Sequence, residues 1–412
     1  MPDPQVTATL IAELEKAEPG LQALLITALV DRAGSRVLGA VEAKAMAPSE
    51  EVRIVALEAL GKIGRDSSLP LLLQAIRAPS GRESAAAFDS LARITAPDAQ
   101  AEILKALPAV GPPLRVKLIS VIGERNADGA ATELLKLALS SDVEISKASL
   151  RALAVVSRPE DLPELTRMAV AMPDQERKTL AARALVTAAV KVPEPERRAD
   201  LVLAQFRQTT DAETKISLLL PLGAIVRSTG GNDKALLVVK SALTDNSERV
   251  RDAALRTLVN WPDAAACLPL VEFSTRSDAT PTQRENALRA AMRMAANVVA
   301  GRDPSPLDPL ALFRKVDRIV RTKDEKLMLV SSLASLKRIE AVQILQRYLD
   351  DPTVQTQAAL AVVQIAPALL NSERGAEIKQ VLERIVATAK DEDARRNAAR
   401  VAKGLPLGDA RP

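Results

Sequence analysis

Histidine is absent from the 412 residues, and the one cysteine is Cys267. Without an imidazole the chain cannot form a Ser-His-Asp or Cys-His catalytic arrangement, a His-ligated haem or a His-bearing zinc site. A lone cysteine cannot form an intrachain disulfide, a thiolate zinc cluster or an iron–sulfur cluster. We therefore expect no metal, no cofactor and no catalytic residue, hence a protein that is not an enzyme. Catalysis by Lys, Asp or Glu alone stays an alternative.

Aromatic residues are also scarce, and the net charge is small. There are one Trp, one Tyr and four Phe, and 56 Lys and Arg stand against 52 Asp and Glu, for a net charge of +4. A chain that neutralises many phosphates normally carries a denser basic patch, so nucleic acid is not the expected partner. The longest apolar runs fall short of the roughly 18–20 residues of a membrane span, and residues 1–20 do not form an export signal. We expect a soluble, cytoplasmic chain with no membrane partner, exported only if it is part of a larger protein.

One helical face recurs along the chain. In the segment 51–64, apolar residues from Val52 to Ile63 follow the i, i+3, i+4, i+7, i+8, i+11 spacing of an amphipathic helix. Val52, the anchor of this helix, has counterparts spaced 31 residues apart from Leu21 to Ile145 and more loosely beyond, with acidic Glu83 as an exception. The twelve anchors are Leu21, Val52, Glu83, Leu114, Ile145, Arg177, Thr214, Val250, Gln283, Glu325, Val354 and Ala394.

A second amphipathic segment lies between successive anchor helices. Examples are 69–78, 131–139, 235–243 and 341–349, each set off by turns rich in Pro, Asp, Ser and Gly. Each anchor helix and the segment before it form a helical hairpin. One hairpin cannot bury both of its faces alone, so neighbouring hairpins must stack. Small and branched aliphatic side chains allow close stacking, which explains the scarcity of aromatics.

Three segments carry a resemblance to a known family. SEEVRIVALEALGKIG (49–64), SERVRDAALRTLVNWP (247–262) and DPTVQTQAALAVVQIA (351–366) resemble the second helix of HEAT repeats, and the pattern covers essentially the whole chain. The chain is similar to bacterial HEAT repeats, including those of phycobilisome lyases and of large multidomain proteins. The resemblance implies an all-α, right-handed solenoid of about twelve two-helix repeats, with the second helices lining the concave surface. We expect one solenoid over residues 1–405, a Pro-rich loop near 301–309 and a C-terminal tail at 406–412.

Two positions of each anchor helix, those of Glu58 and Lys62, lie off the apolar face and are expected to be solvated. The residues at the Glu58 position form what we call the Glu58 row: Glu58, Asp89, Ser120, Arg151, Arg183, Leu220, Arg256, Arg289, Ser331, Leu360 and Arg400. Guanidinium groups suit carboxylate or phosphate partners, although a solvated helix face gives the same pattern. The candidate partner-binding residues are Arg151, Arg183, Arg256 and Arg289 of this row, together with Arg293, which occupies the Lys62 position of its helix.

Other conspicuous residues have structural interpretations. The arginine after the anchor (Arg53, Arg115, Arg251 and Arg395) is expected to bond acidic turn residues of the neighbouring repeat, as in the Asp–Arg ladders of HEAT families. Trp261 and Cys267 are expected in the core, the latter as an inert thiol.

The sequence thus favours a non-catalytic scaffold or adaptor that binds a protein or peptide, including acidic ones, in the solenoid groove. A nucleic-acid-binding protein like the HEAT-like DNA glycosylases, or an accessory module of a larger multidomain enzyme, are the alternatives. Neither the identity of the partner nor the oligomeric state follows from the sequence.

Overall fold

The computed structural model describes residues 4–126 and 128–407. Within those residues the regular structure is helical and no strand occurs, which confirms the all-α prediction. The chain divides into two compact units, Met1–Leu201 and Val202–Pro412. A single solenoid over 1–405 stays a prediction, and most of the tail expected at 406–412 lies outside the described residues.

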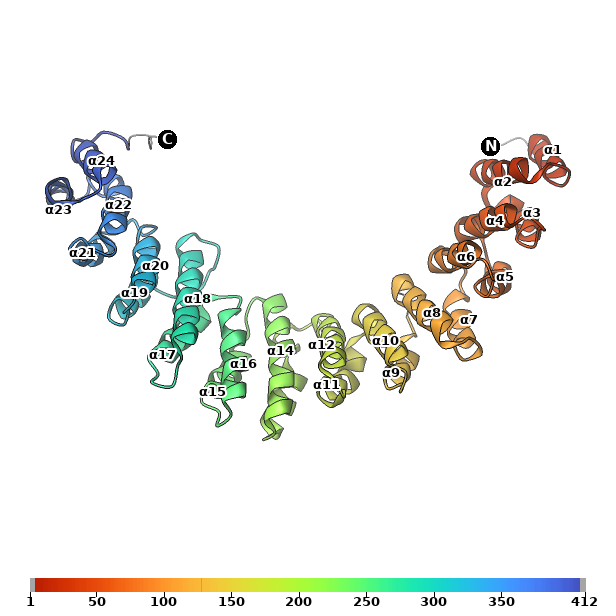
Figure 1. The fold of residues 1–412 in the computed structure, drawn as a ribbon, viewed down its shortest axis with the longest axis horizontal. Helices are drawn as coiled ribbons and strands as arrows, with labels where there is room; N and C mark the ends of the chain where they lie inside the picture. Colours follow the sequence, from red (N-terminus) through yellow and green to blue (C-terminus); the bar gives the residue numbers. More distant parts are fainter. Residues whose placement is uncertain (1–3, 127, 408–412) are drawn as a thin grey trace. The chain divides into compact units, whose positions relative to one another are not determined.

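The first unit consists of helical pairs joined by short turns (Figure 1). Its helices are α1 (Pro4–Leu14), α2 (Pro19–Ala33), α3 (Leu38–Lys44), α4 (Glu50–Ile63), α5 (Leu69–Ala75), α6 (Gly81–Arg93), α7 (Ala99–Ala106), α8 (Pro112–Arg125), α9 (Ala131–Ala138), α10 (Val143–Val156), α11 (Leu162–Ala171) and α12 (Gln175–Val190).

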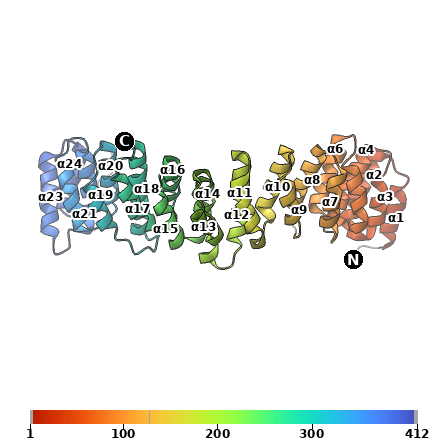
Figure 2. The same cartoon turned by 90° about the horizontal axis from the view of Figure 1, so that it is seen from below.

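The second unit repeats the same plan, and the helices of each unit stand side by side in Figure 2. Its helices are α13 (Asp200–Gln208, which begins just before the unit), α14 (Ala212–Thr229), α15 (Asp233–Ala242), α16 (Glu248–Val259), α17 (Cys267–Ser274), α18 (Pro281–Val299), α19 (Pro309–Asp317), α20 (Lys323–Leu333), α21 (Ile339–Tyr348), α22 (Gln355–Ile365), α23 (Gly375–Thr388) and α24 (Glu392–Ala402). Residues 300–308, between α18 and α19, are not helical.

The even-numbered helices are the anchor helices predicted from the sequence. Each anchor is the third residue of its helix, except Val354, which is the N-cap of α22. Within each unit these helices form one layer and the odd-numbered helices the other, and the even layer lies on the concave side of that unit (Figure 1). The repeat period and the concave placement of the second helices are therefore confirmed for each unit taken by itself.

The core lies along the anchor faces. Val52 and Leu60 of α4 are fully buried, whereas Val55 and Ile63 of the predicted face are half-buried. Leu57 is buried although it lies off that face. The reason is that α4 packs against three helices, its own partner α3 and the neighbours α2 and α6, so that more of its circumference is covered than a single stripe predicts.

The even helices approach one another closely because small residues meet where they cross. A Cβ atom on Gly61 of α4 would lie 2.9 Å from the Oγ of Ser90 on α6. The Ser90 hydroxyl in turn donates to the carbonyl of Leu57 across the same contact, at 2.8 Å. The same two repeat positions are occupied by Gly123 and Ala152 between α8 and α10, and by Gly223 and Thr257 between α14 and α16.

Candidate functional site

An arginine directly after the anchor ties the second helix to the turn before it in three repeats, those of Arg53, Arg115 and Arg251. Arg53 donates from Nη1 to the carbonyls of Ala47 and Pro48, both at 2.9 Å, and from Nη2 to Glu83 Oε2 of the next repeat at 2.8 Å. Arg251, at the same repeat position, donates from Nη1 to the Asp245 carbonyl. Its Nε lies 3.7 Å from Asp278 Oδ2, in the turn of the next repeat. The predicted bond to an acidic turn residue of the next repeat is confirmed for Arg251, whereas the acidic partner of Arg53 is a helix residue, the anchor Glu83 of α6.

The prediction is wrong for Arg115. Its guanidinium donates to the carbonyls of Leu107 and Val110 in its own repeat. The next anchor is Ile145, which offers no carboxylate where Glu83 stands opposite Arg53. Arg395 is exposed and has no ion pair among the described residues, so the predicted bond is absent there as well.

Acidic anchors are partners of these cations rather than interruptions of the pattern. Glu325, the anchor of α20, is 2% exposed and accepts from Arg284 Nε at 2.7 Å, and Arg284 is itself buried. Burial, the largest influence, raises the pKa of Glu325. The hydrogen bonds from Arg284 and from the N–H groups of Arg321 and Thr322 outweigh it and leave the pKa below its ordinary value. Sequence reasoning missed this pair, whose signal is an arginine after one anchor followed by a glutamate at the next.

The Glu58 row is solvated, as the helical period predicts. Each member from Glu58 to Leu360 is exposed, and Arg400 at the end is half-buried. Arg151 on α10 and Arg183 on α12 lie on neighbouring second helices of the first unit. In the second unit, Arg256 lies on α16, and both Arg289 and Arg293 lie on the neighbouring second helix α18. The structure thus places two of these five side chains in the first unit and three in the second.

The five arginines differ in how far they are engaged. Arg183 and Arg256 have no ion pair among the described residues, and Arg151 Nη2 lies 3.6 Å from Glu176 Oε1. Arg289 pairs with Glu285 on its own helix. Arg293 donates to the Val259 carbonyl at the end of α16, at 2.6 Å, a contact that joins two repeats.

The second-helix face of the first unit is hollowed over three consecutive even helices. One hollow of about 240 Å³ lies between α6 and α8, and one of about 380 Å³ lies between α8 and α10. Ser120 and Glu124 line both hollows, so the two adjoin. We call them together the α8 groove; its lining residues are Ala85, Phe88, Asp89, Val116, Lys117, Ser120, Val121, Gly123, Glu124, Ala148, Arg151, Ala152 and Val155.

The α8 groove joins an apolar floor to charges of both signs. Val155 is 44% exposed on the groove surface. The Lys117 ammonium lies 5.4 Å from the centre of the Phe88 ring, a cation–π contact that holds the lysine at the edge of the groove. Asp89 supplies a carboxylate, and Arg151 a guanidinium. Such a surface can bind a mixed apolar and charged chain.

The residues predicted to be buried are buried. Trp261 is 4% exposed, which confirms its place in the core. Cys267 is fully buried, and burial raises the pKa of its thiol to about 12. Since the thiolate is the reactive form, this cysteine is inert in the folded chain.

In residues 4–126 and 128–407, no three His, Cys, Asp or Glu side chains come together as ligands for a metal ion. No helix in the same residues is long and apolar enough to span a bilayer.

Comparison with solved structures shows the fold. The karyopherin Kap121p bound to the extreme C-terminus of the protein phosphatase Cdc14p matches with a TM-score of 0.54 at 13% identity, over 97% of this chain and 49% of that one. Kap121p bound to Nup53p gives a TM-score of 0.54 at 13% identity over 97% and 48%. A homology model of the AP-3 complex gives 0.50 at 11% identity over 97% and 86%. The chain spans about half the length of the Kap121p chains.

Sequence comparison adds the family. No curated protein sequence matches the chain, and neither a bacterial origin nor a likeness to phycobilisome lyases is tested by these comparisons. The family model for HEAT repeats matches residues 7–92 and 38–117. Helical pairs of the same kind continue to Ala402. HEAT repeats are thus identified by sequence in residues 7–117, and the helical pairs beyond them share the two-helix plan of those repeats.

Proposed function

We propose that the chain is a non-catalytic scaffold that binds an extended segment of a partner protein in the α8 groove. The observation that carries this proposal is the adjoining pair of hollows over α6, α8 and α10, which share Ser120 and Glu124. A surface with an exposed apolar floor and charged edges is typical of a protein-binding site.

The dimensions of the groove suit a short extended peptide. Neighbouring packed helices lie about 8–10 Å apart, so that the path from α6 to α10 is roughly 20 Å. An extended chain covers about 3.3 Å per residue, so about six residues cross the groove. Apolar side chains would rest on Val121 and Val155, and an acidic side chain would pair with Lys117 or Arg151.

The solved Kap121p complexes support the general idea only. Kap121p is bound to Nup53p in one of them and to the C-terminal segment of Cdc14p in another. At 13% identity the likeness shows the fold alone, and the choice of groove rests on the residues of this chain.

A peptide selection tests the proposal. Random peptides displayed on phage are selected on the purified chain, and the affinity of the enriched peptides is measured by fluorescence polarisation. Ser120→Trp places an indole in the middle of the groove and should weaken binding at least about tenfold, since it blocks both hollows. Lys105→Glu, a change at an exposed residue of first helix α7, is the matched control and should leave the affinity unchanged.

Arg151 and Arg183 extend the test to the candidate arginines. Arg151→Glu should weaken acidic peptides, and Arg183→Glu should do so only for peptides long enough to reach α12. Peptides that bind Ser120→Trp and the native chain equally well would contradict the proposal. So would tight binding of duplex DNA that falls steeply with added salt, which indicates phosphate contacts.

A further inference from the structure

A second cavity lies in the first unit, at the edge where first helices turn into second helices. Its volume is about 400 Å³, and it is lined by the end of α9, the turn into α10, the length of α11 and the start of α12. It shares no lining residue with the α8 groove, so it is a separate feature. We call it the edge pocket.

The floor of the edge pocket is apolar and includes two methionines. Met168, Ala171 and Met172 line it together with Leu139, which is 62% exposed. An exposed aliphatic side chain that lines a concave site offers apolar surface to a ligand. Methionine side chains adapt to the shape of what they contact.

A guanidinium with free donors stands in the same pocket. Arg177 has its side chain 13% exposed, and its Nε donates to Asp174 Oδ2 at 2.6 Å. The other Asp174 oxygen accepts from the Arg177 backbone N–H at 2.8 Å and caps α12. Among the described residues nothing accepts from Nη1 or Nη2 of Arg177. The part of the guanidinium that binds a carboxylate bidentately is therefore available to a ligand.

The charges at the edge pocket form two ion pairs. Glu164 is paired with Arg167, and Asp174, next to the pocket, is paired with Arg177. Their sum is zero, so any preference for a carboxylate comes from the two Nη donors of Arg177 and not from net charge.

We propose that the edge pocket binds a partner segment in which a large aliphatic residue is followed by an acidic one. The aliphatic side chain fills the space between Leu139 and the two methionines, and the carboxylate accepts from Nη1 and Nη2 of Arg177. This second contact does not rest on the function proposed for the α8 groove, because the two sites have different residues and fail independently.

Methionine-methyl NMR tests this proposal. The chain has seven methionines, so a sample labelled with ¹³C at the methionine methyl groups gives a sparse spectrum. The probe is the acetylated, amidated tetrapeptide Gly-Leu-Asp-Gly, titrated into the millimolar range. Two control peptides replace Asp by Asn, or Leu by Ala. Substitutions Met168→Leu and Met172→Leu assign the two signals.

The Leu-Asp peptide should shift the Met168 and Met172 signals and bind at least about tenfold more tightly than the Leu-Asn and Ala-Asp peptides. Ala171→Trp should fill the pocket and abolish these shifts. In Arg177→Gln the preference for Asp over Asn should disappear, a ratio that loss of stability alone would not change. Arg82→Gln, on α6, is the control and should retain the preference.

The proposal is overturned if the peptide shifts neither methionine signal. It is also overturned if Asp and Asn peptides bind native protein alike, or if Ala171→Trp binds as well as the native chain while the signals of the other methionines show that it is folded.

Discussion

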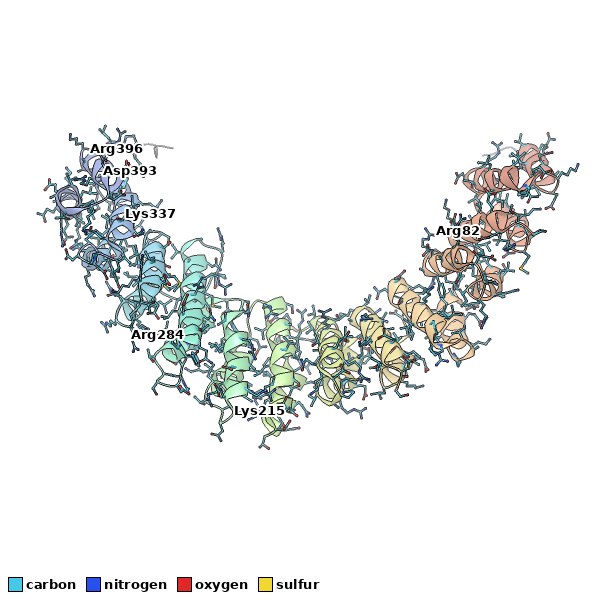
Figure 3. All side chains as sticks on the ribbon, in the orientation of Figure 1. Arg82, Lys215, Arg284, Lys337, Asp393 and Arg396 are labelled. Carbon is cyan, nitrogen blue, oxygen red and sulfur yellow. The ribbon has the colours of Figure 1, made fainter. Side chains whose placement is uncertain are left out.

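Replacing Glu325 by glutamine tests how the repeats are held together in the second unit. Glu325 and Arg284, which is labelled in Figure 3, join α20 to α18 across the long insertion between these helices. Arg284 also donates to the Ser274 carbonyl at 2.6 Å and to the Ile319 carbonyl. Glu325 accepts from the Arg321 N–H at 2.6 Å. Both charges are thus buried, paired and hydrogen-bonded.

The expected loss follows from what glutamine leaves behind. Glu325→Gln keeps the shape but removes the carboxylate, so the buried guanidinium of Arg284 loses its counter-charge. Breaking a buried pair from one side costs about 3–5 kcal/mol, whereas removing both charges can cost much less. The double variant Arg284→Met with Glu325→Gln should therefore be more stable than the sum of the two single changes predicts.

A repeat array can unfold in parts, so a local measurement is needed. Hydrogen exchange read by mass spectrometry reports the opening free energy of peptides from α18 and α20 in each variant. Glu213→Gln breaks the exposed pair with Arg249, also between neighbouring repeats, and should cost less than about 1 kcal/mol. A loss for Glu325→Gln as small as that of this control, or a double variant that is simply additive, would refute the reasoning.

Further predictions concern acid, packing and reactivity. Asp351 has its pKa lowered to about 2, chiefly by a lysine hydrogen bond, so its stabilising effect is complete above the ordinary value of 3.8 and is lost as the pH falls toward 2. Asp351→Asn should flatten the pH dependence of thermal unfolding in that window. Gly61→Ala should destabilise by about 1–3 kcal/mol because its Cβ would meet the tightly held Ser90. Gly39→Ala, where the new Cβ meets nothing within 4 Å, should stabilise by about 0.5–1 kcal/mol in the same unfolding assay. Cys267 should resist iodoacetamide in the native chain and react in urea, as mass spectrometry can show.

The helical repeat could be predicted from the sequence because it depends on a periodic pattern. The 3.6-residue period places Val52 in the core and Glu58 in solvent wherever the helix packs, and both positions are as predicted. The close approach at Gly61 was not predicted, since it depends on which residue of the next helix lies opposite. Single-helix patterns contain no such information.

The candidate site was predicted only in part. The sequence identified Arg151 as exposed, and the structure adds that it borders a hollow shared by α8 and α10. Glu83 looked like a defect of the apolar pattern because its partner, Arg53, lies a whole repeat away. The edge pocket joins residues of two turns with residues of α9, α11 and α12, so that only the packing of neighbouring repeats brings Leu139 and Arg177 together.

Site-specific photocrosslinking tests the central claim most directly, namely that the second-helix face of the first unit binds the partner. Benzoylphenylalanine is placed at Ser120 in one sample and at Lys105 in another, and each is irradiated with a peptide selected on the native chain. We predict a covalent adduct from the probe at Ser120 and none from the probe at Lys105. Adducts of equal yield at the two positions, or an adduct at Lys105 alone, would contradict the claim.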